Sequence, residues 1–229
     1  MKEKLPTIAF EGINRVGKGT QIEKLKCLIT EVGLSSVEIR GDGTRDGLGL
    51  HDGDPFSFWW QQYSKQIRES GTTLDWNFAA YILAKDIKTW REEGRNFNKN
   101  IVLLDRSLIS RATFIIDREK PAIKHLTVDN LYPYQPESRI ELEDILPDII
   151  FELIAPKEIV LSRIDNQDPK KSFRVKLIEE QYDTFYSAKS RLPEIVQEKI
   201  ITLDSSLPID KVFDNILENL NSKLENWNN

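Results

Sequence analysis

Cysteine is almost absent from this sequence of 229 residues, in which Cys27 stands alone. A disulfide within the chain is therefore impossible, and we expect a reducing compartment, the cytoplasm, rather than an oxidising one. Helical spacing of apolar residues around Cys27 predicts that it lies on the apolar side of a first helix.

Long apolar runs, internal repeats and low-complexity linkers are missing as well. No stretch has the length and apolar character of a membrane span, and residues 1–6 lead into an apolar segment without the pattern of a secretory signal. We therefore expect no membrane partner. A length of 229 residues is enough to bury a full core, so we expect a single domain over residues 1–229.

Histidine is scarce, and the charge balance is acidic. His51 and His125 are isolated and lack the spacing of metal ligands. The net charge is −5, which argues against a nucleic-acid polymer as the partner. A small anionic ligand, held by a local group of arginines, remains compatible with this charge.

A glycine-bounded loop with a lysine follows the first apolar segment. Residues 7–10 are expected to form a buried strand and residues 20–30 a helix. Between them, Gly12, Gly17 and Lys18 have the spacing G-x-x-x-x-G-K. The glycines let the backbone turn tightly and bring its N–H groups close to an anion. The sequence therefore predicts a phosphate-binding loop rather than a chance glycine-rich turn.

The residue after the lysine differs from the usual pattern of such loops. A serine or threonine commonly stands there and binds Mg²⁺ through its hydroxyl, whereas here Gly19 precedes Thr20. Asp105 follows another apolar segment, and its carboxylate can hold Mg²⁺ through water. We therefore expect Thr20 and Asp105 to serve the metal. The alternative for Asp105 is a structural cap on the following helix.

Strands and helices alternate along the chain. Further strands are expected at 37–40, 101–104, 148–155 and 199–203, and further helices at 75–92, 107–116, 156–164, 173–187 and 208–224. Continuous apolar strands separated by helices predict an α/β fold, with a parallel five-stranded sheet and helices on both faces.

Such sheets bind ligands at the carboxyl ends of their strands. Gly12, Arg40 and Asp105 all fall at expected strand ends, which favours one shared site. The segments 41–60 and 118–139 fit neither pattern, and they are either loops over the site or surface excursions.

Two stretches of the sequence resemble motifs of a known family. Residues 10–21, FEGINRVGKGTQ, and residues 105–110, DRSLIS, are similar to the phosphate-loop and D-R motifs of thymidylate kinases, a branch of the nucleoside monophosphate kinases in the P-loop superfamily. Residues 147–151 resemble a third family segment. The resemblance covers most of the chain. It implies a kinase that uses ATP and Mg²⁺ to phosphorylate a nucleoside monophosphate, dTMP first of all. A homodimer is compatible with it.

The resemblance also implies roles for single residues. ATP would be bound by the loop and by an arginine before a lid expected at about 164–174: Gly12, Asn14, Arg15, Val16, Gly17, Lys18, Gly19, Thr20 and Arg163. The acceptor nucleotide would be bound by Asn14, Arg40, Arg45, Tyr81, Lys85, Arg106, Ser110 and Phe114. The expected catalytic group is Lys18, Arg15, Asp105 and Arg106, with Arg15 rather than the lid arginines meeting the transition-state charge.

Several positions depart from the family pattern. Asn14 stands where the family has aspartate, Lys85 where it has an arginine that contacts the base, and Ser107 where it has tyrosine. Residues 40–45 lack the family's proline, so Arg40 and Arg45 are only candidate ligands. These departures leave two alternatives: a kinase for another deoxynucleotide or nucleoside, and a nucleotide-binding protein without transfer activity.

Two further residues keep a structural alternative. Tyr81 would stack on the base or else belong to the core, because it lies on an apolar helical face. Glu11 would touch the metal or the acceptor, or else satisfy neighbouring backbone groups.

Overall fold

Five strands form one parallel sheet in this protein. The computed structural model describes residues 4–40, 76–119, 124–126 and 141–227. The strands are β1 (Thr7–Glu11), β2 (Ser36–Arg40), β3 (Ile101–Asp105), β4 (Ile149–Ile154) and β5 (Ile200–Asp204). They are hydrogen-bonded in the order β2-β3-β1-β4-β5. The expected α/β class with a parallel five-stranded sheet is confirmed.

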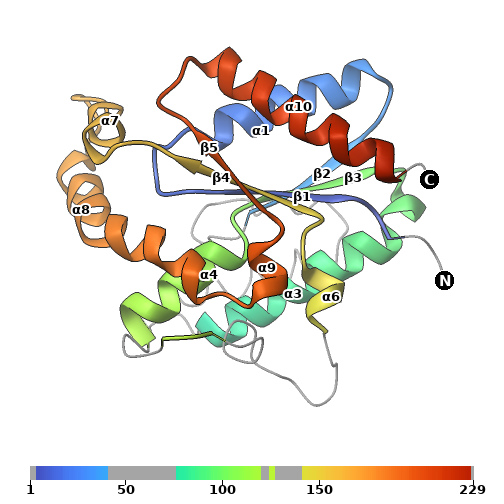
Figure 1. The fold of residues 1–229 in the computed structure, drawn as a ribbon, viewed down its shortest axis with the longest axis horizontal. Coiled ribbons are helices and arrows are strands. Elements are labelled where there is room, and N and C mark those ends of the chain that lie inside the picture. Colours follow the sequence, from blue (N-terminus) through green and yellow to red (C-terminus); the bar gives the residue numbers. More distant parts are fainter. Residues whose placement is uncertain (1–3, 41–75, 120–123, 127–140, 228–229) are drawn as a thin grey trace.

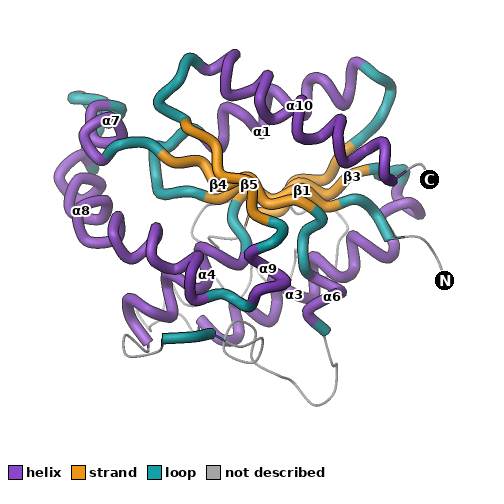
Figure 2. Tube along the Cα trace, in the orientation of Figure 1, coloured by secondary structure: helices purple, strands orange, loops and turns teal. Residues whose placement is uncertain are grey.

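Helices cover both faces of this sheet (Figures 1 and 2). One face carries α1 (Lys18–Glu31) and α10 (Ile209–Trp227). The other carries α3 (Trp76–Glu93), α4 (Leu108–Phe114), α6 (Leu142–Ile145) and α9 (Glu194–Gln197). After β4 come α7 (Lys157–Ser162) and α8 (Lys171–Ala188). Shorter turns are the 3-10 segments η1 (Gly94–Phe97) and η3 (Lys189–Arg191) and the π-helical η2 (Ile115–Glu119).

The central strands β1, β3 and β4 are mostly apolar because both of their faces are buried. In β1, Ile8 and Phe10 pack into the core under α1 and α10, while Ala9 packs into the core under α3 and α4. All three side chains are buried. The alternation of side chains along a strand thus feeds two separate apolar layers.

Three of the connections that follow strands meet at one edge of the sheet. The β1–α1, β3–α4 and β4–α7 connections lie at the edge opposite to the two termini (Figure 1). Asp105 is the register partner of Phe10 on one side and of Arg40 on the other. The strand ends that carry Gly12, Arg40 and Asp105 are therefore neighbours, as the sequence predicts.

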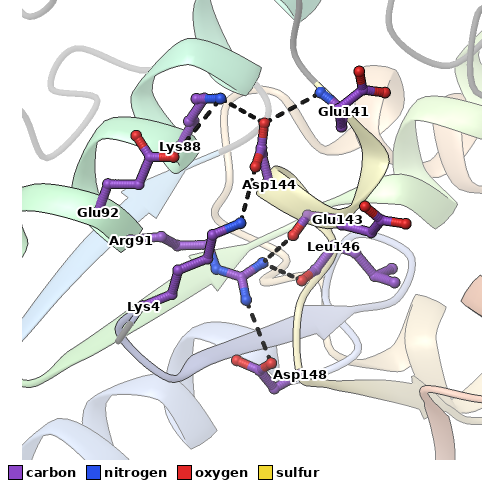
Figure 3. Close-up of polar contacts among 9 residues, drawn as sticks. All are labelled: Lys4, Lys88, Arg91, Glu92, Glu141, Glu143, Asp144, Leu146 and Asp148. Carbon is purple, nitrogen blue, oxygen red and sulfur yellow. Dashed lines mark hydrogen bonds and ion pairs between the residues drawn. The ribbon is translucent and has the colours of Figure 1, made fainter. Parts of the chain in front are cut away.

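The opposite edge is held together by a polar cluster, which Figure 3 shows in close-up. Asp144 of α6 pairs with Lys4 at 2.9 Å and with Lys88 of α3 at 2.5 Å. The buried guanidinium of Arg91 donates to the backbone carbonyl of Leu146 and pairs with Asp148 at 3.4 Å. These contacts join the chain before β1 to α3 and to the segment before β4.

Cys27 lies on the exposed side of α1, so its expected place on the apolar side is wrong. The buried stripe of this helix runs through Ile22, Leu25 and Ile29. Cys27 is two residues from both Leu25 and Ile29, which turns it away from that stripe. Among the described residues, no helix combines the length and the apolar character that a bilayer crossing requires.

Candidate active site

The loop between β1 and α1 has a backbone that only glycine tolerates at two positions. Gly12 has φ +145°, and a Cβ atom there would lie 2.6 Å from Cγ1 of Val16 and 2.8 Å from the carbonyl oxygen of Leu153. Gly17 has φ +110°. Both glycines of the G-x-x-x-x-G-K spacing are therefore needed for the shape of the loop.

Lys18 starts α1 and folds back over this loop. Its Nζ donates to the carbonyl oxygens of Gly12 at 3.0 Å and of Ile13 at 3.3 Å, and the residue is only 7% exposed. No side chain caps the N-terminus of α1 at Gly17. The helix N–H groups and a lysine ammonium thus surround one loop, an arrangement that suits phosphate oxygens.

Arg106 brings the end of β3 onto the same loop. Its Nη2 donates to Oδ1 of Asn14 at 2.6 Å, and its Nη1 donates to the carbonyl oxygen of Gly12 at 3.3 Å. Arg106 and Arg15 adopt left-handed backbone conformations, with φ 81° and 69°. Such conformations are strained for non-glycine residues and concentrate at functional sites. Both arginines expected to be catalytic therefore have strained backbones.

Glu11 organises the start of α4 from the neighbouring strand. The residue is fully buried. Its Oε1 accepts from the backbone N–H groups of Ser107, Ile109 and Ser110, and its Oε2 accepts from Oγ of Ser110 at 2.6 Å. Of the two roles open to Glu11 in the sequence, the structure thus shows the contact with backbone groups. The carboxylate supplies the acceptors that the first N–H groups of a helix lack.

Ser110 links Glu11 to Arg106 through its hydroxyl group. Its hydroxyl donates to Glu11 and accepts from Nη1 of Arg106 at 3.0 Å. A continuous chain of hydrogen bonds therefore runs from Glu11 through Ser110 and Arg106 to Asn14. Each member limits the orientation of the next.

The residues expected to serve the metal fit a cation in part. Oδ1 of Asp105 is buried and accepts no hydrogen bond from the described residues. A buried carboxylate oxygen without a donor is suited to a hydrated cation. Thr20 is exposed on α1, and a Cβ atom at Gly19 would meet nothing within 4 Å. Within the described ranges, His, Cys, Asp and Glu nowhere form a group of three or more that could hold a metal ion.

Three arginines lie in or near the loop: Arg15 within it, and Arg163 and Arg174 from the chain after β4. Arg163, just after α7, donates to the carbonyl oxygens of Val16 at 2.9 Å and Ser205 at 2.6 Å. It thereby holds the loop to the end of β5. Arg15 and Arg174 both pair with Asp168, at 3.0 Å and 2.7 Å. Helix α8 already begins at Lys171, so part of the expected lid at 164–174 is helical.

Other predicted acceptor residues are placed only by their backbone or lie outside the described residues. Arg40 ends β2, Phe114 ends α4, and Tyr81 lies within α3. Lys85 is a half-buried residue of α3. Arg45, His51 and the whole of segment 41–60 fall outside the described residues, as does most of segment 118–139.

Two contacts in the candidate site were not predicted from the sequence. The link from Glu11 through Ser110 to Arg106 depends on the pairing of β1 with β3, which residue types alone do not reveal. Asp168 falls within the lid expected at about 164–174, but no role was predicted for it. Its position between two arginines depends on the way in which α8 folds back toward the phosphate loop.

Comparison with protein-family models and with curated proteins finds no match. Comparison with solved structures finds the thymidylate kinase from Candida albicans, with a TM-score of 0.56 and 18% sequence identity. The similarity covers 96% of this chain and 92% of that chain. At this identity the comparison shows a shared fold alone, across nearly the whole chain.

Proposed function

We propose that this protein transfers the γ-phosphoryl group of ATP to a nucleoside monophosphate, with dTMP as the first acceptor to consider. The observation that carries the proposal is the contact between the phosphate-binding loop and the end of β3. Arg106 reaches Asn14 and the carbonyl of Gly12, while Lys18 lies over the same loop. A site for the donor phosphates thus adjoins a guanidinium that can bind the phosphate of an acceptor.

The reaction needs positioning and charge neutralisation more than proton transfer. An acceptor phosphate is already an anion, so no general base is required, and the difficulty is to bring two polyanions together. Lys18 and the N–H groups of the loop would hold the β- and γ-phosphates. Arg106 would hold the acceptor phosphate, and Arg15 would meet the charge on the phosphoryl group as it moves.

Asp105 and Thr20 are the residues that would hold Mg²⁺. Asp105 offers a buried carboxylate oxygen without a donor among the described residues, and Thr20 offers a hydroxyl on α1. When bound with ATP, Mg²⁺ supplies positive charge to the phosphate oxygens. Gly19 has no side-chain hydroxyl to contribute, so we expect water to complete the coordination shell.

Asn14 would contact the sugar of the acceptor nucleotide. Because its Oδ1 accepts from Arg106, the amide of Asn14 presents N–H donors to a ligand. A sugar hydroxyl would therefore accept a hydrogen bond from Asn14, where the carboxylate of an aspartate could only accept one. The Candida albicans enzyme is described as having broad substrate specificity. We propose a similar breadth here, with dTMP preferred over purine monophosphates.

A panel of nucleoside monophosphates tests this proposal. Each would be incubated with ATP and Mg²⁺, and formation of the diphosphate would be measured rather than ADP release alone, which ATP hydrolysis also produces. We expect dTMP to be phosphorylated better than AMP, GMP or CMP. A preference for a purine monophosphate would overturn the dTMP assignment and keep the kinase. ATP binding without any diphosphate would favour a nucleotide-binding protein.

We propose the cytoplasm as the compartment, because a single cysteine suits a reducing environment and ATP is abundant there. We propose a homodimer only on the resemblance to thymidylate kinases, and sedimentation of the purified chain would test it.

A further inference from the structure

One carboxylate gathers two arginines beside the phosphate-binding loop. Oδ2 of Asp168 lies 3.0 Å from Nη2 of Arg15 and 2.7 Å from Nε of Arg174. Arg15 belongs to the loop after β1, and Arg174 belongs to the first turn of α8. Asp168 precedes that helix. The carboxylate therefore joins two parts of the chain that lie far apart in the sequence.

Backbone hydrogen bonds hold the Asp168 carboxylate in place. Oδ1 of Asp168 accepts from the N–H of Lys170 at 2.9 Å, and the Asp168 carbonyl accepts from the N–H of Lys171 at 2.9 Å. The hydrogen bond from the backbone of Lys170, with Arg174 and Arg15 adding to it, lowers the pKa of the Asp168 carboxyl. The carboxyl group is therefore ionised at neutral pH. The turn formed by residues 168–171 limits the positions that the carboxylate, and so the two guanidinium groups, can take.

Burial distinguishes the acid from its partners. The side chain of Asp168 is 9% exposed, against 37% for Arg15 and 27% for Arg174. One nitrogen of each guanidinium lies within ion-pair distance of the carboxylate, and that of Arg15 donates a hydrogen bond to it. A guanidinium has five N–H donors, so most donors of both groups remain for a second anion.

Two guanidinium groups repel each other unless an anion lies between them. The transferring phosphoryl group is such an anion, but only while the substrates are bound. Asp168 supplies a permanent one. A pair of arginines that is already assembled loses less freedom when the phosphoryl group arrives than a pair that must be brought together.

We propose that Asp168 is a positioning residue that holds Arg15 and Arg174 together, so that both guanidinium groups act on the transferring phosphoryl group. The inference rests on the proposed kinase function. The loop that carries Arg15 and the helix α8 that carries Arg174 would then act together. Loss of the Asp168 carboxylate would separate the two arginines, although neither arginine is changed.

The test compares Asp168→Asn with the matched variant Asp165→Asn. Both side chains accept a hydrogen bond from the backbone N–H two residues later, at 2.9 Å and 2.8 Å, and asparagine can keep that bond. Each variant removes one negative charge from the same segment, but of these two carboxylates only that of Asp168 pairs with arginines among the described residues. We expect Asp168→Asn to lower kcat about tenfold while the KM for ATP changes less than about twofold. Asp165→Asn should match the wild type.

A double-mutant cycle shows whether Asp168 acts through Arg15. In the Arg15→Ala background, Asp168→Asn should cost much less than the roughly tenfold loss in kcat that it causes alone. Equal costs in both backgrounds would overturn the proposal. The same cycle on the thermal unfolding of the ligand-free protein gives a readout without catalysis, in which we expect coupling between the two residues.

The opposite role for Asp168 is a competitor that neutralises the arginines until phosphates displace it. Calorimetric binding of ADP separates the two roles. Tighter ADP binding by Asp168→Asn with an unchanged or raised kcat would overturn the positioning role, whereas unchanged or weaker binding with a lowered kcat supports it. A wild type that forms no diphosphate with any acceptor would overturn the proposed function itself. An active wild type with an equally active Asp168→Asn would overturn only the role of Asp168.

Discussion

Ser110 joins a buried carboxylate to the guanidinium expected to bind the acceptor. Its hydroxyl donates to Glu11 and accepts from Nη1 of Arg106 at 3.0 Å, whereas the bond from Nη1 to the Gly12 carbonyl is longer, at 3.3 Å. The position of Arg106 therefore depends on a side chain that need not touch the substrate. Hydrogen bonds from such a supporting side chain hold in place the groups that touch the substrate.

We expect Ser110→Ala to raise the KM for the acceptor by about three- to tenfold and to leave the KM for ATP nearly unchanged. Ser107→Ala is the matched control, because Oγ of Ser107 is buried without a hydrogen-bond partner among the described residues. Steady-state kinetics with each substrate varied in turn measures both constants. A rise in the KM for ATP alone would show that the chain from Glu11 serves the donor.

The two glycines at positions 12 and 19 give a second prediction. Gly12→Ala places a Cβ atom 2.6 Å from Val16 at φ +145°, so we expect it to lower the free energy of unfolding by about 2 kcal/mol or more. At Gly19 nothing lies within 4 Å, and Gly19→Ala should stabilise α1 by up to about 1 kcal/mol. Thermal unfolding of both variants measures the difference. Equal stabilities would contradict the geometry of the loop.

At the scale of single residues, a role can be predicted from the sequence when it depends on residues nearby in the chain. Gly12, Gly17 and Lys18 follow from one local spacing, and the positive φ values of both glycines agree with it. The contact of Arg106 with Asn14 joins residues that are distant in the sequence. It arises only because β1 and β3 are neighbours in the sheet, so residue types alone could not predict it.

Helices α3 and α6 are joined by one carboxylate, and this gives a prediction about pH. Asp144 contacts Lys88 of α3 and Lys4 before β1 (Figure 3). Burial alone would raise the pKa of the Asp144 carboxyl, but the ion pairs with Lys88 and Lys4 and the N–H of Glu141 outweigh it and lower the pKa to about 2. A depressed pKa stabilises the folded state at a pH above the ordinary value of 3.8.

This stabilisation is present at neutral pH and is lost as the pH falls from about 4 to about 2. We expect it to amount to roughly 1 kcal/mol, because solvent screens part of the ion pairs. Asp144→Asn should therefore lower the free energy of unfolding in urea at pH 6 and have little effect near pH 2. Asp210→Asn is the control, since Asp210 is 87% exposed in its pair with Lys24. A loss from Asp144→Asn that persists unchanged at pH 2 would contradict the ionic origin.

Elements were predicted well where they are long or fully apolar. The five strands lie within about one residue of their expected bounds, because both faces of each central strand are buried and the apolar run has sharp ends. The helix expected at 107–116 ends at Phe114 and continues as the π-helical η2. The four-residue helices α6 and α9 were not predicted, because one turn shows no apolar period.

At the scale of the whole molecule, the strand order decides which motifs can cooperate. The order β2-β3-β1-β4-β5 places β1 between β3 and β4. The loop between β1 and α1 thus lies between the Asp105-Arg106 turn and the segment that leads through Arg163 to α8. Alternating strands and helices predict a parallel sheet, but they do not state its order, which comes from pairing between distant strands. The common edge was inferred correctly because all parallel strands end on the same side.

The fate of the γ-phosphate of ATP tests the central claim most directly. ATP labelled at that position would be incubated with the wild type, Mg²⁺ and dTMP, and with the variants Lys18→Ala and Lys24→Ala. The account predicts label in dTDP with the wild type and with Lys24→Ala, whose lysine lies on the same helix in a surface pair with Asp210. With Lys18→Ala, transfer should fall at least about a hundredfold, because the cation over the phosphate loop is lost. Label that appears only as inorganic phosphate, or that stays in ATP with every acceptor offered, would contradict the account.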